Sequence, residues 1–234
     1  MIRRLLLWDV DGTLVRAGEL GAAVFDSALE MVLGMKPTSR VRMSGKTDPQ
    51  IVQEYLEQMG VEETDERVDA ILRGIEVQLA AASADGELAA GGSALPGVGA
   101  ALRILAADDR VLSTLVTGNV APNAFLKVAA FGLDQWLDLE VGAYGSDDAD
   151  RNRLVPIAVT RVASARGVLL DPTDVWVIGD TPRDLECARA AGSRCLLVGT
   201  GRYSSEELAP LGADAVFDDL SNVDAVVNLL AGDL

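Results

Sequence analysis

Two aspartates that follow the first apolar run of the chain are the side chains best suited to do chemistry. Residues 5–8 are apolar, and Asp9 and Asp11 come shortly after them, followed by Gly12 and Thr13. Side chains two positions apart on an extended chain point the same way, and glycine lets the backbone turn sharply after them. Crowded carboxylates repel each other unless a cation lies between them. The pair therefore predicts a bound cation between the two carboxylates, although a turn with a helix cap is also compatible with it.

Two further apolar runs end in polar residues of complementary kinds. Thr117, Gly118 and Asn119 offer a hydroxyl, an amide and backbone donors at a helix start, which suits the oxygens of a phosphate group. Asp180 and Asp184 follow a later run. Ligands of open α/β sheets bind outside the carboxyl ends of the strands, so we expect these groups to lie near the first aspartate pair. Each motif alone remains compatible with an ordinary turn or helix cap.

The composition narrows the chemistry. The chain has 20 basic and 36 acidic residues and no histidine, which excludes histidine-based acid/base catalysis and histidine-ligated zinc. A net charge of -16 disfavours nucleic acid as a partner, and a phosphorylated metabolite would need a cation to offset that charge. Cys187 and Cys195 are expected to be reduced thiols in the cytoplasm. No stretch is long and apolar enough to predict a membrane span.

Short apolar runs alternate with segments of helical periodicity, which is typical of βαβ units. The predicted strands are residues 5–10, 111–117, 139–141, 175–178, 195–198 and 215–217. We therefore predict an α/β fold with a Rossmann-like, doubly wound parallel sheet.

A long helical segment separates the first two predicted strands. It is much longer than one crossover helix requires. Helical patterns within it occupy residues 19–33, 49–59 and 66–82. We predict a core domain formed by residues 1–15 and 94–234, with a small helical cap domain inserted at residues 16–93.

The order and spacing of the motifs resemble the haloacid dehalogenase-like (HAD) hydrolase superfamily. Its first motif, Asp-x-Asp-Gly-Thr, matches residues 9–13, and its fourth, Gly-Asp-x-x-x-Asp, matches residues 179–184. The resemblance runs over the whole chain, and the helical insertion is similar to the small cap of the phosphoglycolate phosphatase and β-phosphoglucomutase branch. This resemblance implies a phosphoric monoester hydrolase that uses Mg²⁺ and acts on a small phosphorylated metabolite.

The resemblance also implies a role for each polar residue of the motifs. Asp9 would be the nucleophile that becomes an aspartyl phosphate, and Asp11 would protonate the leaving oxygen and then activate water. Asp9, the backbone carbonyl of Asp11, and Asp180 would bind Mg²⁺, with Asp184 acting through water. Thr117 would hold the phosphate oxygens.

Two basic residues are candidates for binding the substrate, one at the third motif of the family and one in the cap. The third motif usually supplies a lysine, and here Arg151 occupies that position, with Arg153 as the fallback. An arginine can neutralise phosphate with a fixed fork of donors, but Arg151 follows an acidic run and could instead be solvated. In the cap, Lys46 precedes a helix start and could reach the substrate when the cap closes. A solvated loop lysine is an equal alternative.

Several functions share these residues. A β-phosphoglucomutase-like sugar-phosphate mutase would differ in how the cap shields the phosphorylated aspartate from water. A non-catalytic phosphometabolite-binding module would keep the same fold. Metal-free dehalogenases do not use the second acid, so Asp11 argues against them. We expect a phosphatase for a small phosphomonoester such as phosphoglycolate, while the substrate and the oligomeric state stay open.

Overall fold

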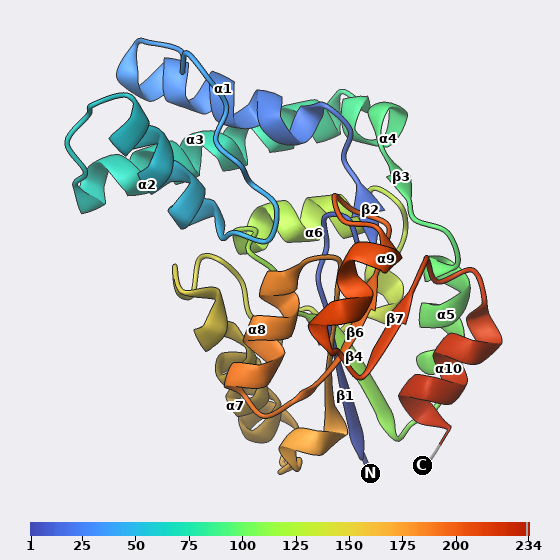
Figure 1. Cartoon of the computed structure of the whole chain (residues 1–234). Coiled ribbons are helices and arrows are strands. Elements are labelled where there is room, and N and C mark those ends of the chain that lie inside the picture. Colours follow the sequence, from blue (N-terminus) through green and yellow to red (C-terminus); the bar gives the residue numbers. More distant parts are fainter. Residues whose placement is uncertain (233) are drawn as a thin grey trace.

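The computed structural model, which describes residues 1–232 and residue 234, contains a five-stranded sheet covered by helices (Figure 1). The strands are β1 (Arg4–Trp8), β4 (Val111–Leu115), β5 (Val175–Gly179), β6 (Arg194–Val198) and β7 (Ala215–Phe217). Their order is β4-β1-β5-β6-β7, and all neighbours pair in parallel. The predicted α/β fold with a Rossmann-like parallel sheet is confirmed.

The register of the three strands around β1 brings their carboxyl ends to one level. Trp8 of β1 lies opposite Leu115 of β4 and Ile178 of β5. Every residue of β1 and of β5 is buried, as expected for parallel strands covered on both faces. The segments that follow these strands therefore leave the sheet side by side.

The helices of this unit pack on the two faces of the sheet. They are α5 (Val98–Leu105), α6 (Ala121–Ala129), α7 (Leu154–Arg166), α8 (Pro182–Ala190), α9 (Ser205–Leu208) and α10 (Val223–Ala231). Short 3-10 turns are η1 (Asp134–Trp136), η2 (Arg151–Arg153), η3 (Pro172–Asp174) and η4 (Ala209–Leu211). Leu6 and Trp8 of β1 pack in one hydrophobic cluster with α5, α6 and α10, whereas Leu5 and Leu7 pack in another with α7 and α8. The alternation of side chains along β1 thus holds both layers in place.

Between β1 and β4 the chain forms a helical unit above the carboxyl end of the sheet (Figure 1). Its helices are α1 (Leu20–Leu33), α2 (Asp48–Gln58), α3 (Asp65–Ala84) and α4 (Glu87–Gly91). They enclose their own hydrophobic cluster, which includes Phe25, Tyr55 and Ile75. An antiparallel ribbon of β2 (Val15–Arg16) and β3 (Ser93–Ala94) connects this unit to the sheet.

The starts of the inserted helices follow ordinary capping chemistry. The hydroxyl of Thr47 accepts a hydrogen bond from the N–H of Gln50, and the side-chain carbonyl of Gln50 accepts one from the N–H of Thr47. Thr64 caps α3 by accepting from the N–H of Arg67. Such caps satisfy backbone donors that have no partner within the helix. The three helices predicted in this segment are found with ends shifted by at most two residues.

The strand predicted at residues 139–141 is wrong. This segment forms a turn, and a single parallel bridge between Val116 and Ala143 lies just after it. The hydroxyl of Tyr144 donates to the carbonyl of Leu139 at 2.6 Å, so a side chain takes the place of a neighbouring strand. A short apolar run cannot be told from a buried turn by its pattern alone.

Both cysteines lie in the hydrophobic interior. Cys187 and Cys195 are buried free thiols. Among the residues that the structure describes, no helix combines the length and the apolar character needed to cross a membrane.

Candidate active site

The ends of β1 and β5 place three carboxylates within reach of one another. Asp9 follows β1, and its N–H donates to the carbonyl of Ile178 at 2.9 Å. Asp180 follows β5, and Asp184 lies in the first turn of α8. Each of the three aspartates is at most 5% exposed, and oxygen atoms from all three lie within 4.8 Å of one another. Asp11 is more open, with a side chain that is 44% exposed.

Burial and mutual repulsion disfavour the ionised forms of this cluster. Burial raises the pKa of Asp9 to about 6, despite the opposing effect of the Arg151 guanidinium. Burial, together with the charges of Asp184 and Asp9, raises the pKa of Asp180 to about 8. A divalent cation would relieve this repulsion, and Mg²⁺ prefers such carboxylate oxygens. The residues present therefore fit a magnesium ion.

Arg151 brings positive charge to the site from η2. Its Nη2 atom lies 2.5 Å from Oδ1 of Asp184 and 3.2 Å from Oδ1 of Asp9. Burial opposes the charged guanidinium, but Asp184 and Asp9 raise its pKa overall. Arg153, the other arginine considered for the third motif, has a side chain that is 70% exposed and pairs with Asp148. Arg151, and not Arg153, faces Asp9.

Both carboxylate oxygens of Asp184 are engaged by donors. Oδ1 accepts from Arg151, and Oδ2 accepts from the N–H of Thr181 at 3.0 Å and from its hydroxyl at 2.7 Å. A metal ion bound directly to Asp184 would compete with these donors. The contacts therefore favour Asp184 as the group that orients Arg151, and leave Asp9 and Asp180 as the carboxylates available to a cation.

The turn after β4 brings Thr117, Gly118 and Asn119 to the same edge of the sheet. Thr117 is completely buried, and its Oγ1 atom accepts from the side-chain amide of Asn119 at 2.9 Å. The same amide nitrogen donates to Oδ2 of Asp11 at 2.8 Å. Asn119 thus links the predicted phosphate-binding turn to the aspartate pair.

Lys127, which lies in α6, joins the site although it was not predicted. Its Nζ atom lies 2.5 Å from Oδ2 of Asp11 and 2.6 Å from Oδ1 of Asn119. Lys127 is only 7% exposed, and its helical neighbours Ala124 and Val128 belong to a hydrophobic cluster of the sheet. A lysine on the apolar face of an amphipathic helix was the available signal.

The inserted helices reach the site through the start of α2, where Asp48 was also missed. The N–H of Asp48 donates to the carbonyl of Gly118 at 2.7 Å, and its carboxylate accepts from the N–H of Val120 at 2.8 Å. A Cβ atom on Gly118 would lie 2.0 Å from the carbonyl oxygen of Lys46, so this approach requires glycine. Acidic residues are common in first helical turns, and sequence therefore carried no distinguishing signal for Asp48.

A cavity of about 400 Å³ opens between the sheet edge and the inserted helices. Its core side includes Asp9, Asp11 and Asp180, and its other side includes Lys46. The Lys46 ammonium forms an ion pair with Glu54 of α2, so part of its charge is already compensated. The size suits a small metabolite.

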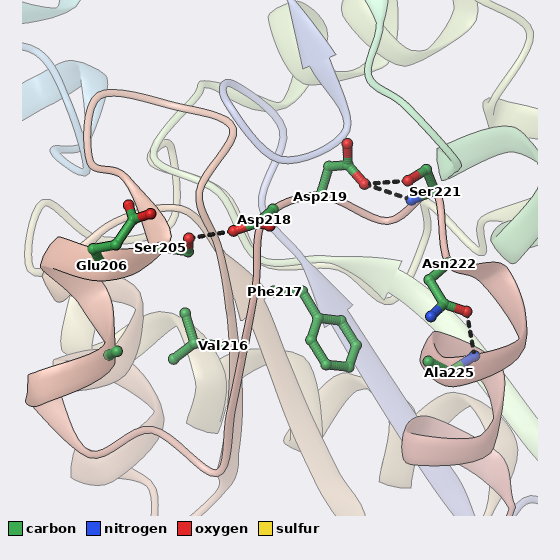
Figure 2. A pocket seen from close by; sticks show the side chains of 10 residues that line it. Ser205, Glu206, Val216, Phe217, Asp218, Asp219, Ser221, Asn222 and Ala225 are labelled. Atoms are coloured by element: carbon green, nitrogen blue, oxygen red, sulfur yellow. Dashed lines mark hydrogen bonds between the residues drawn. The ribbon is translucent and has the colours of Figure 1, made fainter.

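A second hollow, of about 510 Å³, lies beside β7 and contains none of these residues (Figure 2). Figure 2 shows the hydroxyl of Ser205 bonded to Asp218 and that of Ser221 bonded to Asp219. β7 is separated from β1 by β5 and β6. The larger hollow therefore lies away from the clustered carboxylates, and its own acids have neighbouring donors.

Comparison with known proteins gives two sequence matches of the same kind. The profile of a family described as HAD-hydrolase-like matches residues 155–223. A phosphoglycolate phosphatase from Rhodospirillum rubrum is 28% identical over 222 residues, which cover 94% of this chain and 89% of the relative. Both matches support the haloacid dehalogenase-like hydrolases as the superfamily that this chain resembles. The family indicated by the sequence motifs is thereby confirmed.

Solved structures share the fold of this chain. A hydrolase from Pseudomonas syringae superposes with a TM-score of 0.73 at 20% identity, covering 98% of this chain and 100% of that one. CbbY from Rhodobacter sphaeroides, solved in complex with phosphate, gives a TM-score of 0.69 at 21% identity, covering 95% and 96% of the two chains. At these identities the likeness concerns the fold.

Magnesium is expected to raise the unfolding temperature of the protein, and to do so more at high pH. The raised pKa values of Asp9 and Asp180 mean that stability is lost as the pH rises through them. A bound cation offsets that loss where both groups are ionised. Thermal unfolding with and without Mg²⁺, at about pH 6 and about pH 8.5, measures the effect. Asp180→Asn should remove most of the pH-dependent gain, and an equal gain in both proteins would contradict the assignment.

Asp48→Asn is expected to stabilise the folded protein at pH values above about 6. Burial raises the pKa of Asp48 to about 6 even though Lys127 opposes the shift, so ionised Asp48 costs stability as the pH rises. Asparagine keeps an acceptor for the N–H of Val120 without the charge. We expect a gain of about 1–2 kcal/mol near pH 8 that shrinks toward pH 4.

Thermal or denaturant unfolding across that pH range measures the gain. Glu57→Gln removes an exposed charge from the same helix and serves as the control, for which no pH-dependent gain is expected. A gain from Asp48→Asn that stays constant with pH would show that its charge is not the cause.

Proposed function

We propose that this HAD hydrolase is a magnesium-dependent phosphatase that hydrolyses a small phosphomonoester through an aspartyl phosphate on Asp9. The observation that carries the proposal is the convergence of Asp9, Asp11, Asp180 and Arg151 on one cavity at the carboxyl edge of the sheet. The HAD-like match and the phosphoglycolate phosphatase relative support a phosphatase at the level of the family.

Asp9 is the group we assign to nucleophilic attack. Its backbone is held by a buried strand, and the Arg151 guanidinium lies 3.2 Å from its carboxylate. A carboxylate can approach a phosphate dianion only where the repulsion between them is screened. Mg²⁺ bound by Asp9 and Asp180 would add to the screening from Arg151. As the bond from Asp9 to phosphorus forms, the bond from phosphorus to the ester oxygen breaks.

Asp11 is the group we assign to proton transfer. It lies outside the buried cluster, and its half-exposed side chain lines the cavity. In the first step a protonated Asp11 gives its proton to the departing ester oxygen. In the second step the Asp11 carboxylate takes a proton from the water that attacks the phosphorus, which frees phosphate and restores Asp9.

The turn after β4 supplies the donors we assign to the phosphate group. Thr117 carries a buried hydroxyl, and among the described residues the N–H of Gly118 has no hydrogen-bond acceptor. Donors at the start of a helix suit an anion, because the helix dipole also favours negative charge there. The side chain of Asn119 would act beside them through its bond to Asp11.

The inserted helices act in this proposal as a cap domain of residues 16–93 over a core of residues 1–15 and 94–234. Docking of the cap on Gly118 would exclude bulk water from the cavity and define the space for the leaving group. Lys46 lies on the cap wall of that cavity. We assign to it the second anionic group of a substrate such as 2-phosphoglycolate.

Asp9→Asn and Asp11→Asn are expected to abolish and to reduce phosphate release, respectively. The first variant lacks the nucleophile, and the second lacks the acid and base, a loss of about 10²–10⁴-fold in kcat. Release of phosphate from an aryl phosphate, with Mg²⁺ and with a chelator, measures both. Unchanged turnover in Asp9→Asn would overturn the mechanism. Isomerisation of β-glucose 1-phosphate without net phosphate release would support a mutase instead.

Lys46→Met is expected to raise KM for 2-phosphoglycolate by about tenfold, with a smaller effect on an aryl phosphate. Only the first substrate carries a carboxylate for the ammonium to bind, and one lost ionic hydrogen bond is worth about 1.5 kcal/mol or more. Lys36→Met provides a control, because Lys36 also lies in the cap and pairs with an acid but is 67% exposed. Equal changes of KM for both substrates would exclude a carboxylate-binding role for Lys46.

A further inference from the structure

Lys127 forms a closed set of hydrogen bonds around one oxygen of Asp11. Its ammonium lies 2.5 Å from Oδ2 of Asp11 and 2.6 Å from the carbonyl oxygen of the Asn119 side chain. The amide nitrogen of Asn119 lies 2.8 Å from the same Oδ2 atom and 2.9 Å from Oγ1 of Thr117. We propose that Lys127, acting with Asn119, is a positioning residue that fixes the Asp11 carboxyl group for proton transfer. This inference rests on the proposed phosphatase function.

The two carboxylate oxygens of Asp11 have different hydrogen-bond partners. Oδ2 receives both donors, whereas Oδ1 accepts no hydrogen bond from the residues that the structure describes. One oxygen is therefore held, and the other has no protein donor within the described chain and stays available to the ester oxygen or to water in the cavity that Asp11 lines. A side chain that is 44% exposed would otherwise sample several rotamers.

The cost of placing a lysine here argues for a role beyond stability. Lys127 is 7% exposed and lies on the apolar face of α6, where Ala124 and Val128 pack against the sheet. A buried ammonium loses hydration and is retained only where partners satisfy it, and an apolar residue of similar size is often at least as stabilising. Lys127 directs its charge to Asp11 at the edge of the cavity.

The helix α6, which carries Lys127, also contacts the cap. α6 begins after Val120, whose N–H donates to Asp48 of the cap, and α6 packs against α3. Lys127 also lowers the pKa of Asp48 from the value that burial alone would give. Lys127, which holds Asp11, therefore lies on α6, the helix that the docked cap contacts directly.

A double-mutant cycle tests this role. With an alkyl phosphomonoester, whose leaving oxygen needs a proton, we expect Lys127→Met to lower kcat by about 10- to 100-fold with little change in KM. In an Asp11→Asn background the same change should have almost no further effect, because the group it positions is gone. With an activated aryl phosphate the loss in the first step should be smaller. Lys127→Arg should recover part of the activity.

The controls separate positioning from folding and from the phosphatase proposal itself. Arg166→Met removes a pair of the same 2.5 Å length, to Asp138, and should keep the wild-type kcat. If wild type releases phosphate and Asp9→Asn does not, the proposed phosphatase function is supported independently of the result for Lys127→Met.

Two outcomes would overturn the positioning role. One is a raised KM with intact kcat, which would make Lys127 a substrate-binding group. The other is a loss that adds in full to that of Asp11→Asn. Crystal structures of wild type and Lys127→Met test the role without measuring turnover. We expect the Asp11 side chain to lose its single orientation in the variant. An unchanged Asp11 side chain would also refute the role. If Lys127→Met fails to fold, Lys127→Gln is carried through the same cycle.

Discussion

Repulsion among buried carboxylates is the constraint on which the rest of this structure depends. Asp9, Asp180 and Asp184 converge at one edge of the sheet, and burial raises the pKa of the first two. Arg151 offsets part of the negative charge through its contacts to Asp9 and Asp184. The remainder is suited to a divalent cation, which is often the largest local charge in such a site. Groups that destabilise the fold are thus kept where phosphoryl chemistry needs them.

Two kinds of support hold these groups in place. The level ends of β1, β4 and β5 determine where the carboxylates leave the sheet, and helix layers on both faces make that frame rigid. The helix α6 adds a connection between the inserted helices and Asp11. At its start Val120 meets Asp48 of the cap, and further along Lys127 meets Asp11. The contact of the inserted helices and the placement of the Asp11 side chain are therefore joined through one short helix.

The sequence predicts well those positions that follow directly from a local pattern. Asp9 and Asp11 could be placed at a strand end, because parallel strands and a period of two determine which side chains share an edge. Lys127 was missed although its place on the apolar face of a predicted helix offered a signal. Asp48 was missed because its contacts arise only when the inserted helices meet the strand ends in three dimensions. The strand at residues 139–141 failed because a short apolar run carries no information about its hydrogen-bond partner. Long periodic helices were the most predictable elements, since packing and propensity agree there.

The proposed function depends on covalent phosphorylation of Asp9, and chemical trapping tests this step most directly. The protein is mixed briefly with a phosphomonoester and Mg²⁺, quenched in acid, reduced with borohydride and analysed by peptide mass spectrometry. An aspartyl phosphate is an acyl phosphate, and its reduction converts the side chain to that of homoserine. We expect homoserine at position 9 in the wild type and none in Asp9→Asn. Steady phosphate release without this product, or reduction at a different aspartate, would contradict the account.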